Sequence, residues 1–476
     1  MEKYTSLSEI QGLIAQGATT LPDLLEHYFL RIKEYEHLNA FNEVFFLSAR
    51  EQASAVQAKM SAGRAGKLAG MVIGIKDNIC YKNHKVTASS RMLENFVSPY
   101  SATVVERLLA EDAVIIGRLN CDEFAMGGSN ETSFFGPVRN AADEDRVAGG
   151  SSGGSAVAVQ AGLCLAALGT DTGGSVRQPA AFCGNIGLKP TYGRISRYGV
   201  IAYASSFDQV GTITSSVDDA ALLLEVLAGA DAYDSTVSAL PAGPYRQIRE
   251  PETKRRIAVL KETIESEALD PEIRQAISNS IELLKNAGHT IDYVSFDLLD
   301  YLVPTYYILT TAESSSNLSR YDGVHYGYRN TEATSLNELY KRSRAEGFGE
   351  EVKKRIMLGT FVLSAGYYDA YYQKAQQVRR LIREKIDLVL SAYDFILCPV
   401  TPTPAFRIGE NIKDPLVMYM EDIFTVLASL AGTPAIALPL GNNSDNLPLS
   451  VQFIAKHFDE GGLLSFSRHF LEITKQ

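Results

Sequence analysis

The sequence predicts an α/β fold, because segments with helical and strand periodicity alternate along the chain. A helix followed by a strand is expected over residues 103–117, and a strand–helix–strand unit over residues 257–296. Near the end, residues 393–406 and 434–440 contain apolar runs typical of core strands. The 476 residues are 46% hydrophobic and 21% charged, so the chain can bury a large core.

The first part of the chain, to about residue 62, is expected to consist of helices packed on the outside of this core. Pro22 stands at a typical helix start, and apolar residues then recur at helical spacing from Leu24 to Ile32.

Three further regions have a distinct character within what we expect to be a single domain over residues 1–476. Residues 217–229 predict a strongly apolar helix, and residues 230–255, rich in proline and charge, predict a connector. Residues 300–380 are expected to be mostly helical and are rich in tyrosine. No internal repeat is evident.

Composition excludes several classes of function. A net charge of −11 disfavours a main nucleic-acid-binding surface, which needs clustered lysine and arginine. The five cysteines are dispersed and form no C-x-x-C pair, which indicates reduced thiols and no zinc site. The N-terminus has no apolar core of a signal peptide, and the longest apolar run is interrupted at Gln160. We therefore expect a soluble cytoplasmic protein with no membrane partner and no metal.

The chain is organised around one stretch, Gly149 to Ser175, in which two glycine–serine clusters flank an apolar run. A helix over about residues 153–162 would run roughly 15 Å outward, and a strand over about residues 163–170 is long enough to return past it. This path can bring Ser151 and Ser175 together in loops with exposed amides. Two hydroxyls and donor amides suit acyl transfer.

Lys76 stands at the end of a second apolar strand, predicted over residues 71–75. Neighbouring strands would desolvate its amine, which lowers the pKa of a lysine and allows it to act as a base. The alternative is a lysine that reaches the surface or pairs with Asp77.

Other nucleophile patterns fit less well. Residues 149–153 match the G-x-S-x-G elbow formally, but a polar loop precedes them in place of the required strand. All seven histidines lie outside the serine region, no S-x-x-K occurs, and no Walker loop is present. Cys183 has no histidine nearby and is expected to be a small buried residue. What remains is a serine activated by lysine through a second serine.

The segments GGSSGGS and GTDTGGSVRQPAAFCG, together with the position of Lys76, resemble the amidase signature family. The resemblance implies a large mixed β-sheet with helices on both faces. It also implies that Ser175 is the nucleophile, that Lys76 is the base, and that Ser151 bridges them after a cis peptide bond. The implied oxyanion hole consists of the backbone amides of Thr172, Gly173, Gly174 and Ser175.

A closer resemblance covers nearly the whole chain and is to the A subunits of aspartyl/glutamyl-tRNA amidotransferases. It is carried by residues 121–140, 188–211, 306–329 and 353–372. These proteins are glutaminases that release ammonia to a B subunit, where Glu-tRNA(Gln) or Asp-tRNA(Asn) is activated by ATP and amidated. A small C subunit clasps the two into a heterotrimer. The resemblance implies no cofactor in this chain, with ATP, magnesium and charged tRNA bound by the B subunit.

Glutamine carries a carboxylate and an ammonium on one carbon, so its pocket needs a cation and an anion close together. By motif position, the resemblance implies Arg355 for the carboxylate, Asp422 for the ammonium and Tyr306 as a further contact. Arg355 lies in a basic segment where a solvated arginine is common, and Tyr307 is a rival for Tyr306.

The chain departs from the family pattern at Ala141 and Ala148, where proline is usual, and at Arg118, where lysine is common. We expect these to be loop-stiffening or surface differences. Two alternatives remain open: a free-standing amidase acting on another small amide, and a non-catalytic scaffold. A scaffold would be expected to have lost Lys76 or one of the two serines.

Overall fold

The computed structural model describes residues 3–248, 254–411 and 415–474. Its strands are β1 (Phe41–Val44), β2 (Val72–Lys76), β3 (Val114–Leu119), β4 (Ala166–Asp171), β5 (Ile186–Lys189), β6 (Gln209–Thr214), β7 (Arg256–Leu260), β8 (Thr290–Val294), β9 (Phe395–Pro399), β10 (Ala435–Asn442) and β11 (Pro448–Ala455). They form one sheet in the order β1-β3-β2-β4-β6-β5-β10-β11-β9-β7-β8. Strand β2 is parallel to both neighbours, whereas β6, β5, β10 and β11 pair antiparallel, so the sheet is mixed as expected.

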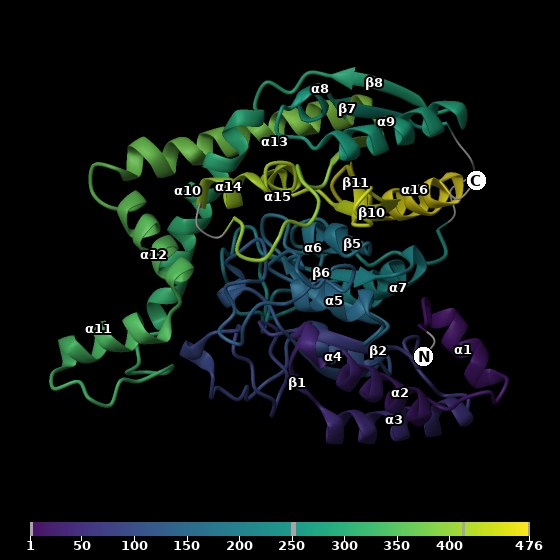
Figure 1. Ribbon diagram of the computed structural model, residues 1–476, viewed down its shortest axis with the longest axis horizontal. Coiled ribbons are helices and arrows are strands. Elements are labelled where there is room, and N and C mark those ends of the chain that lie inside the picture. Colours follow the sequence, from purple (N-terminus) through teal and green to yellow (C-terminus); the bar gives the residue numbers. More distant parts are fainter. Residues whose placement is uncertain (1–2, 249–253, 412–414, 475–476) are drawn as a thin grey trace.

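Helices surround this sheet (Figure 1). They are α1 (Leu7–Ala15), α2 (Leu21–Glu34), α3 (Phe46–Ser61), α4 (Thr103–Ala110), α5 (Gly153–Gln160), α6 (Arg177–Phe182), α7 (Val217–Leu227), α8 (Lys261–Glu265), α9 (Pro271–Asn286), α10 (Leu299–Asn317), α11 (Leu336–Gly347), α12 (Glu350–Val362), α13 (Lys374–Ala392), α14 (Pro415–Met420), α15 (Val426–Ala431) and α16 (Glu460–Ile473). Short 3-10 or π turns cover Glu36–Leu38, Arg91–Leu93, Glu123–Ala125, Leu318–Arg320 and Tyr368–Gln373. The α/β class predicted from the alternating pattern is confirmed.

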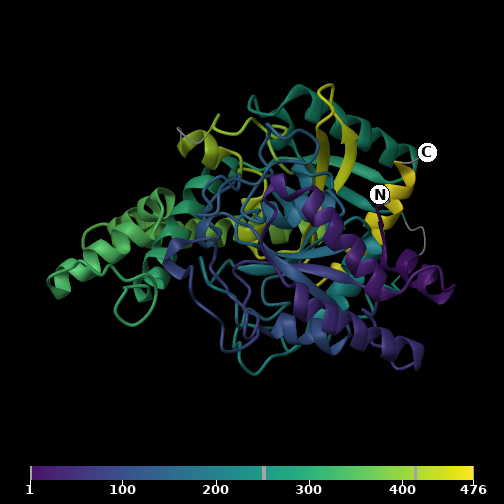
Figure 2. The same cartoon turned by 60° about the horizontal axis from the view of Figure 1, so that its bottom comes forward.

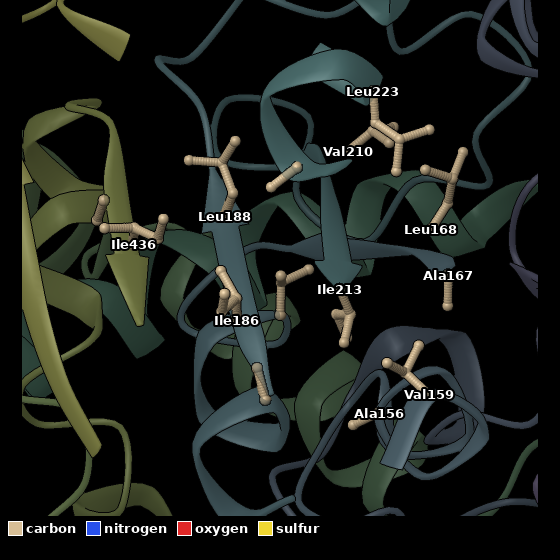
Figure 3. Packing of buried hydrophobic residues seen from close by; sticks show 14 of the residues in the cluster. Ala156, Val159, Ala167, Leu168, Ile186, Leu188, Val210, Ile213, Leu223 and Ile436 are labelled. Atoms are coloured by element: carbon tan, nitrogen blue, oxygen red, sulfur yellow. The ribbon is translucent and has the colours of Figure 1, made fainter. Parts of the chain in front are cut away.

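The centre of the sheet is packed from both sides (Figure 3). Ala156 of α5 lies toward Ile213 on β6, while Leu223 of α7 lies beside Val210 on the other side of the same strand. All four side chains are fully buried or nearly so. Since side chains alternate between the faces of a strand, β6 contributes to both halves of the core.

Glycines bring the serine stretch unusually close to the sheet. A Cβ on Gly169 of β4 would lie 2.7 Å from the Ser152 hydroxyl, and one on Gly187 of β5 would lie 2.6 Å from the Cβ of Ala180 in α6. Both separations are below normal contact, so β4 lies directly against the first serine loop and β5 lies directly against the helix that follows the second.

The N-terminal region is not all helical, which corrects the expectation for residues up to 62. Strand β1 lies between α2 and α3 and pairs antiparallel with β3 at the edge of the sheet. Four residues are too few to show a periodicity of two, and the strand forms because β3 offers it an unpaired edge.

Helices α11 and α12 project sideways from the body of the molecule (Figures 1 and 2). They belong to the region predicted to be helical over residues 300–380. Of the connector expected over residues 230–255, residues 249–253 lie outside the described residues. No helix in the described ranges is both long and apolar enough to cross a membrane.

Arg118 is not a surface residue, which corrects a second expectation. Its side chain is 4% exposed and pairs with Asp77 at 2.7 Å and with Glu43 at 3.2 Å. It therefore links β3 to the end of β2 and to β1. The ion pair also occupies Asp77, the carboxylate that was the alternative partner for Lys76.

Candidate active site

Lys76 is the last residue of β2, and its amine is completely buried. The Nζ atom donates to the Ser151 hydroxyl at 2.7 Å, to the Ser152 hydroxyl at 2.9 Å and to the Thr170 hydroxyl at 3.0 Å. The lysine therefore neither reaches the surface nor pairs with Asp77.

Burial lowers the pKa of Lys76 to about 8. The nearby groups of Cys121, Asp122, Asp171 and Asp208 act in the opposite direction and limit the shift. An amine with this pKa is partly neutral at physiological pH, so it can accept a proton from the serine beside it.

The two serine loops meet as the element lengths predict. Helix α5 begins at Gly153, immediately after the first loop, and β4 returns to end at Asp171, just before the second. The Ser152 amide donates to the Ser175 carbonyl at 3.1 Å. The peptide bond between Gly150 and Ser151 is cis, in agreement with the family pattern.

Exposure distinguishes the serines. Ser151 and Ser152 are completely buried, whereas Ser175 is 8% exposed. Within the described part of the chain, the Ser175 hydroxyl makes no hydrogen bond. Ser175 is thus the most exposed of the three serines, whereas the lysine contacts Ser151 and Ser152.

The loop over residues 172–175 presents free backbone amides. Among the described residues, none of its four amides has a backbone acceptor. Asp171 anchors the loop on one side through a fully buried ion pair with Arg177 at 2.9 Å. On the other side, the Thr172 hydroxyl donates to Asp208 at 2.8 Å. Amides held in this way can stabilise a negative oxygen that develops on a bound carbonyl.

Arg355 of α12 is buried and 3% exposed, which corrects the interpretation of it as a solvated arginine. Its Nε donates to Glu351 at 2.8 Å, and its Nη1 donates to the Tyr203 hydroxyl at 3.0 Å. Glu351 lies one helical turn earlier, whereas Tyr203 comes from a distant segment that the sequence spacing does not connect with Arg355.

Asp422 faces the same group of tyrosines. Its Oδ2 accepts a hydrogen bond from the Tyr307 hydroxyl at 2.8 Å, and burial raises its pKa to about 7. The guanidinium of Arg355 lies 5.3 Å from the centre of the Tyr307 ring. Tyr307 thus bridges the cation and the anion.

Tyr306 occupies a different position from Tyr307. A Cβ on Gly173 would lie 2.5 Å from the Tyr306 hydroxyl, so this ring packs directly on the loop that carries the free amides. The two neighbouring tyrosines therefore have different contacts: Tyr306 packs on the loop, and Tyr307 lies between Arg355 and Asp422.

A cavity of about 200 Å³ opens beside Arg355. Its lining includes Glu123, Gly128, Ser129, Gly349, Glu351, Arg355, Met418 and Tyr419. The described residues contain no cluster of three or more histidine, cysteine or acidic side chains that could hold a metal ion. The five cysteines are buried and unpaired.

Sequence reasoning missed several residues of this site. Ser152 and Thr170 share the amine of Lys76, and Tyr203, Glu351 and Tyr419 surround Arg355. Ser152 and Thr170 lie inside or beside the serine motifs, so proximity in sequence could have found them. Tyr203 and Tyr419 come from segments far from Arg355 along the chain and carry no such signal.

Comparison with known proteins agrees with this geometry. The family model described as Amidase matches residues 23–464. The A subunit of the glutamyl-tRNA(Gln) amidotransferase of Chlorobium luteolum is 48% identical over 98% of this chain and 97% of its own length. The solved A subunit of the same enzyme from Thermotoga maritima is 41% identical, with a TM-score of 0.77 over 94% of this chain and 90% of its own. The solved peptide amidase of Stenotrophomonas maltophilia is 28% identical, with a TM-score of 0.85 over 99% of this chain and 97% of its own.

Proposed function

Because the chain belongs to the amidase family, we propose that it is the glutaminase component of a tRNA-dependent amidotransferase. The observation that carries most weight for glutamine is the buried pair of opposite charges, Arg355 and Asp422, joined through Tyr307. A free amino acid presents one carboxylate and one ammonium on the same carbon, whereas most simple amides present neither.

The reaction starts from Lys76, which takes a proton from the Ser151 hydroxyl at 2.7 Å. Ser151 in turn takes the proton of Ser175, whose side chain must turn toward it when substrate is bound. The Ser175 oxygen then attacks the side-chain carboxamide carbon of glutamine, and the amides of residues 172–175 stabilise the oxyanion. The proton returns along the relay to the leaving nitrogen, ammonia departs, and water hydrolyses the resulting acyl-enzyme.

Recognition of glutamine is assigned to three side chains. Arg355 binds the α-carboxylate, Asp422 binds the α-ammonium, and Tyr306 contacts the substrate beside the amide-bearing loop. The hydroxyl of Tyr307 holds the Asp422 carboxylate in place.

The ammonia is used elsewhere. We assign the transfer to a partner, the B subunit, which would bind ATP, magnesium and charged tRNA, while a small C subunit would complete a cytoplasmic heterotrimer. The net charge of −11 fits a chain that leaves tRNA binding to its partner. The product is Gln-tRNA, Asn-tRNA or both, according to the tRNA that the partner presents.

The first test is ammonia release from glutamine by the Ser175→Ala variant, alone and with the B and C subunits, ATP and charged tRNA. We expect a loss of at least about 10³-fold, because alanine has no hydroxyl that could attack the carboxamide. Ser155→Ala is the matched control: that buried hydroxyl donates only to the Leu168 carbonyl at 3.0 Å, and its loss should leave turnover nearly intact.

The response to the partner subunits separates the two candidate functions. Partner-dependent ammonia release that disappears in Ser175→Ala supports the whole proposal. Hydrolysis of other small amides with no response to the partners would instead indicate a free-standing amidase, with the same serine–lysine chemistry.

The pH dependence of kcat/KM for glutamine provides a second prediction. Lys76, with a pKa of about 8, and Asp422, with a pKa of about 7, must both lose a proton to act as base and as ammonium ligand. We expect activity to rise about 100-fold per pH unit below about pH 7, about tenfold per unit up to about pH 8, and then to level off. Asp422→Asn should remove the steeper limb. A flat profile over this range would contradict both assignments.

A further inference from the structure

Glu351 lies in the first turn of α12, one turn before Arg355. Its Oε1 accepts from the Arg355 Nε at 2.8 Å and from the Tyr419 hydroxyl at 3.1 Å. The side chain of the glutamate is 17% exposed and that of the arginine 4%, so water screens their interaction only weakly.

The guanidinium of Arg355 has a well-defined set of neighbours. The rings of Tyr203, Tyr307 and Tyr419 lie 5.3–5.6 Å from it, and its Nη1 donates to Tyr203. In the described part of the chain, Nη2 makes no hydrogen bond, and Arg355 lines the cavity. A guanidinium has five donors, so some of them remain for a carboxylate in the cavity while Glu351 holds the Nε edge.

The charges of the pocket follow from these contacts. Glu351 neutralises Arg355, and Asp422 adds a second acid on the other side of Tyr307. Besides Arg355 and Glu351, the charged residues that line the cavity are Glu123, Glu350 and Lys354. Glu350 is 81% exposed and pairs with Lys353 at 2.5 Å, so it contributes little inside the pocket.

A ligand with a carboxylate alone therefore meets an arginine whose charge is already balanced, next to a second acid. A ligand that also carries an ammonium has no net charge, and its ammonium pairs with Asp422, so it leaves one uncompensated negative charge fewer in the pocket. The cost of an unpaired buried charge is large, so this difference decides which amides bind.

We infer that Glu351 is a specificity-determining residue, which restricts the pocket to amides that carry both an α-carboxylate and an α-ammonium. The inference rests on the proposed function and extends it from the two groups that contact glutamine to the residue that sets their charge balance. Glu351 acts through Arg355 and is a positioning residue.

The test compares two ligands on a protein that cannot turn over. Ser175→Ala, in the reconstituted complex, is titrated by calorimetry with glutamine and with 4-carbamoylbutanoate, which has the same carboxamide and carboxylate but no amino group. We expect the protein with Glu351 to prefer glutamine strongly. The preference is the ratio of the two dissociation constants. In the Ser175→Ala/Glu351→Gln variant, this ratio should fall by about tenfold or more, because 4-carbamoylbutanoate binds more tightly.

Two controls separate charge from structure. Glu350→Gln removes the same charge one residue away and should leave the preference unchanged. Tyr419→Phe removes the second hydrogen bond of Glu351 but keeps its charge, and should also leave the preference unchanged. Thermal unfolding of each variant verifies that it is folded.

An unchanged preference in Glu351→Gln, equal weakening of both ligands, or the same narrowing in Tyr419→Phe would each overturn the inference. Failure of the proposed function is distinguishable from these results. In that case the protein with Glu351 intact would bind neither ligand, and Ser175→Ala would not affect ammonia release.

Discussion

Replacing Lys76 by methionine is expected to lower kcat/KM for glutamine by about 10³-fold while leaving the protein folded. Methionine fills the buried space but cannot accept the proton of Ser151, and a lost general base typically costs about 10²- to 10⁴-fold, so about 10³-fold is the central expectation. KM should change little, because Lys76 contacts serines and Thr170 and makes no hydrogen bond with the residues proposed to bind glutamine. Ammonia release at saturating and limiting glutamine measures both effects.

Lys189 provides a matched control for this substitution. It is also a buried lysine at the end of a strand, β5, and burial lowers its pKa to about 7. Its Nζ donates to the carbonyls of Pro190 and Thr433, and not to a serine. Lys189→Met should lower the unfolding midpoint but keep activity per folded molecule within a few fold. Equal loss of activity in the two variants would argue against Lys76 as the base.

The largest effect on stability is expected from Arg177→Met. Arg177 and Asp171 are both completely buried, and the guanidinium also donates to the Thr425 carbonyl at 2.8 Å and to Gln452 at 2.7 Å. Removing one partner of a buried ion pair leaves the other charge uncompensated and costs about 3–5 kcal/mol. The free energy of unfolding in urea measures this loss, and ammonia release should fall with it because Asp171 anchors the loop over residues 172–175.

The pKa of Asp171 supports this expectation. Burial acts to raise it, but Arg177 and the neighbouring amides act more strongly, and it stays below the ordinary value of an aspartate. The comparison variant is Arg380→Met, which breaks an ion pair with Glu384 at the surface. The side chain of Arg380 is 80% exposed and that of Glu384 is 54% exposed. This change should cost less than about 0.5 kcal/mol. A similar small loss for Arg177→Met would mean that the buried pair contributes little.

Much of the fold could be predicted from periodicity. The strand that ends at Lys76 is observed over Val72–Lys76, and the helix and strand expected over residues 103–117 are α4 and β3. These elements are long enough to show a repeat. Strand β1 could not be found in this way, because its four residues form a strand only where β3 is available to pair with them.

The candidate site was predictable in part for the same reason. Element lengths indicate that the loops of Ser151 and Ser175 can meet, and the apolar run over residues 71–75 places Lys76 at the end of a buried strand. Nothing local, however, indicates that Arg118 occupies Asp77 and so keeps that carboxylate away from the lysine.

The sequence alone therefore determined the helix and strand that connect the two serine loops, and it determined the position of the lysine at a strand end. Both features depend on the lengths and spacing of local segments. Only the tertiary structure decided which serine is partly exposed and how the charge of Arg355 is balanced. Exposure and charge balance depend on side chains such as Tyr203 and Tyr419, which come from distant segments and meet only when the sheet and its helices have packed. The physical reason is that desolvation is a property of the assembled surroundings, which no stretch of chain carries by itself.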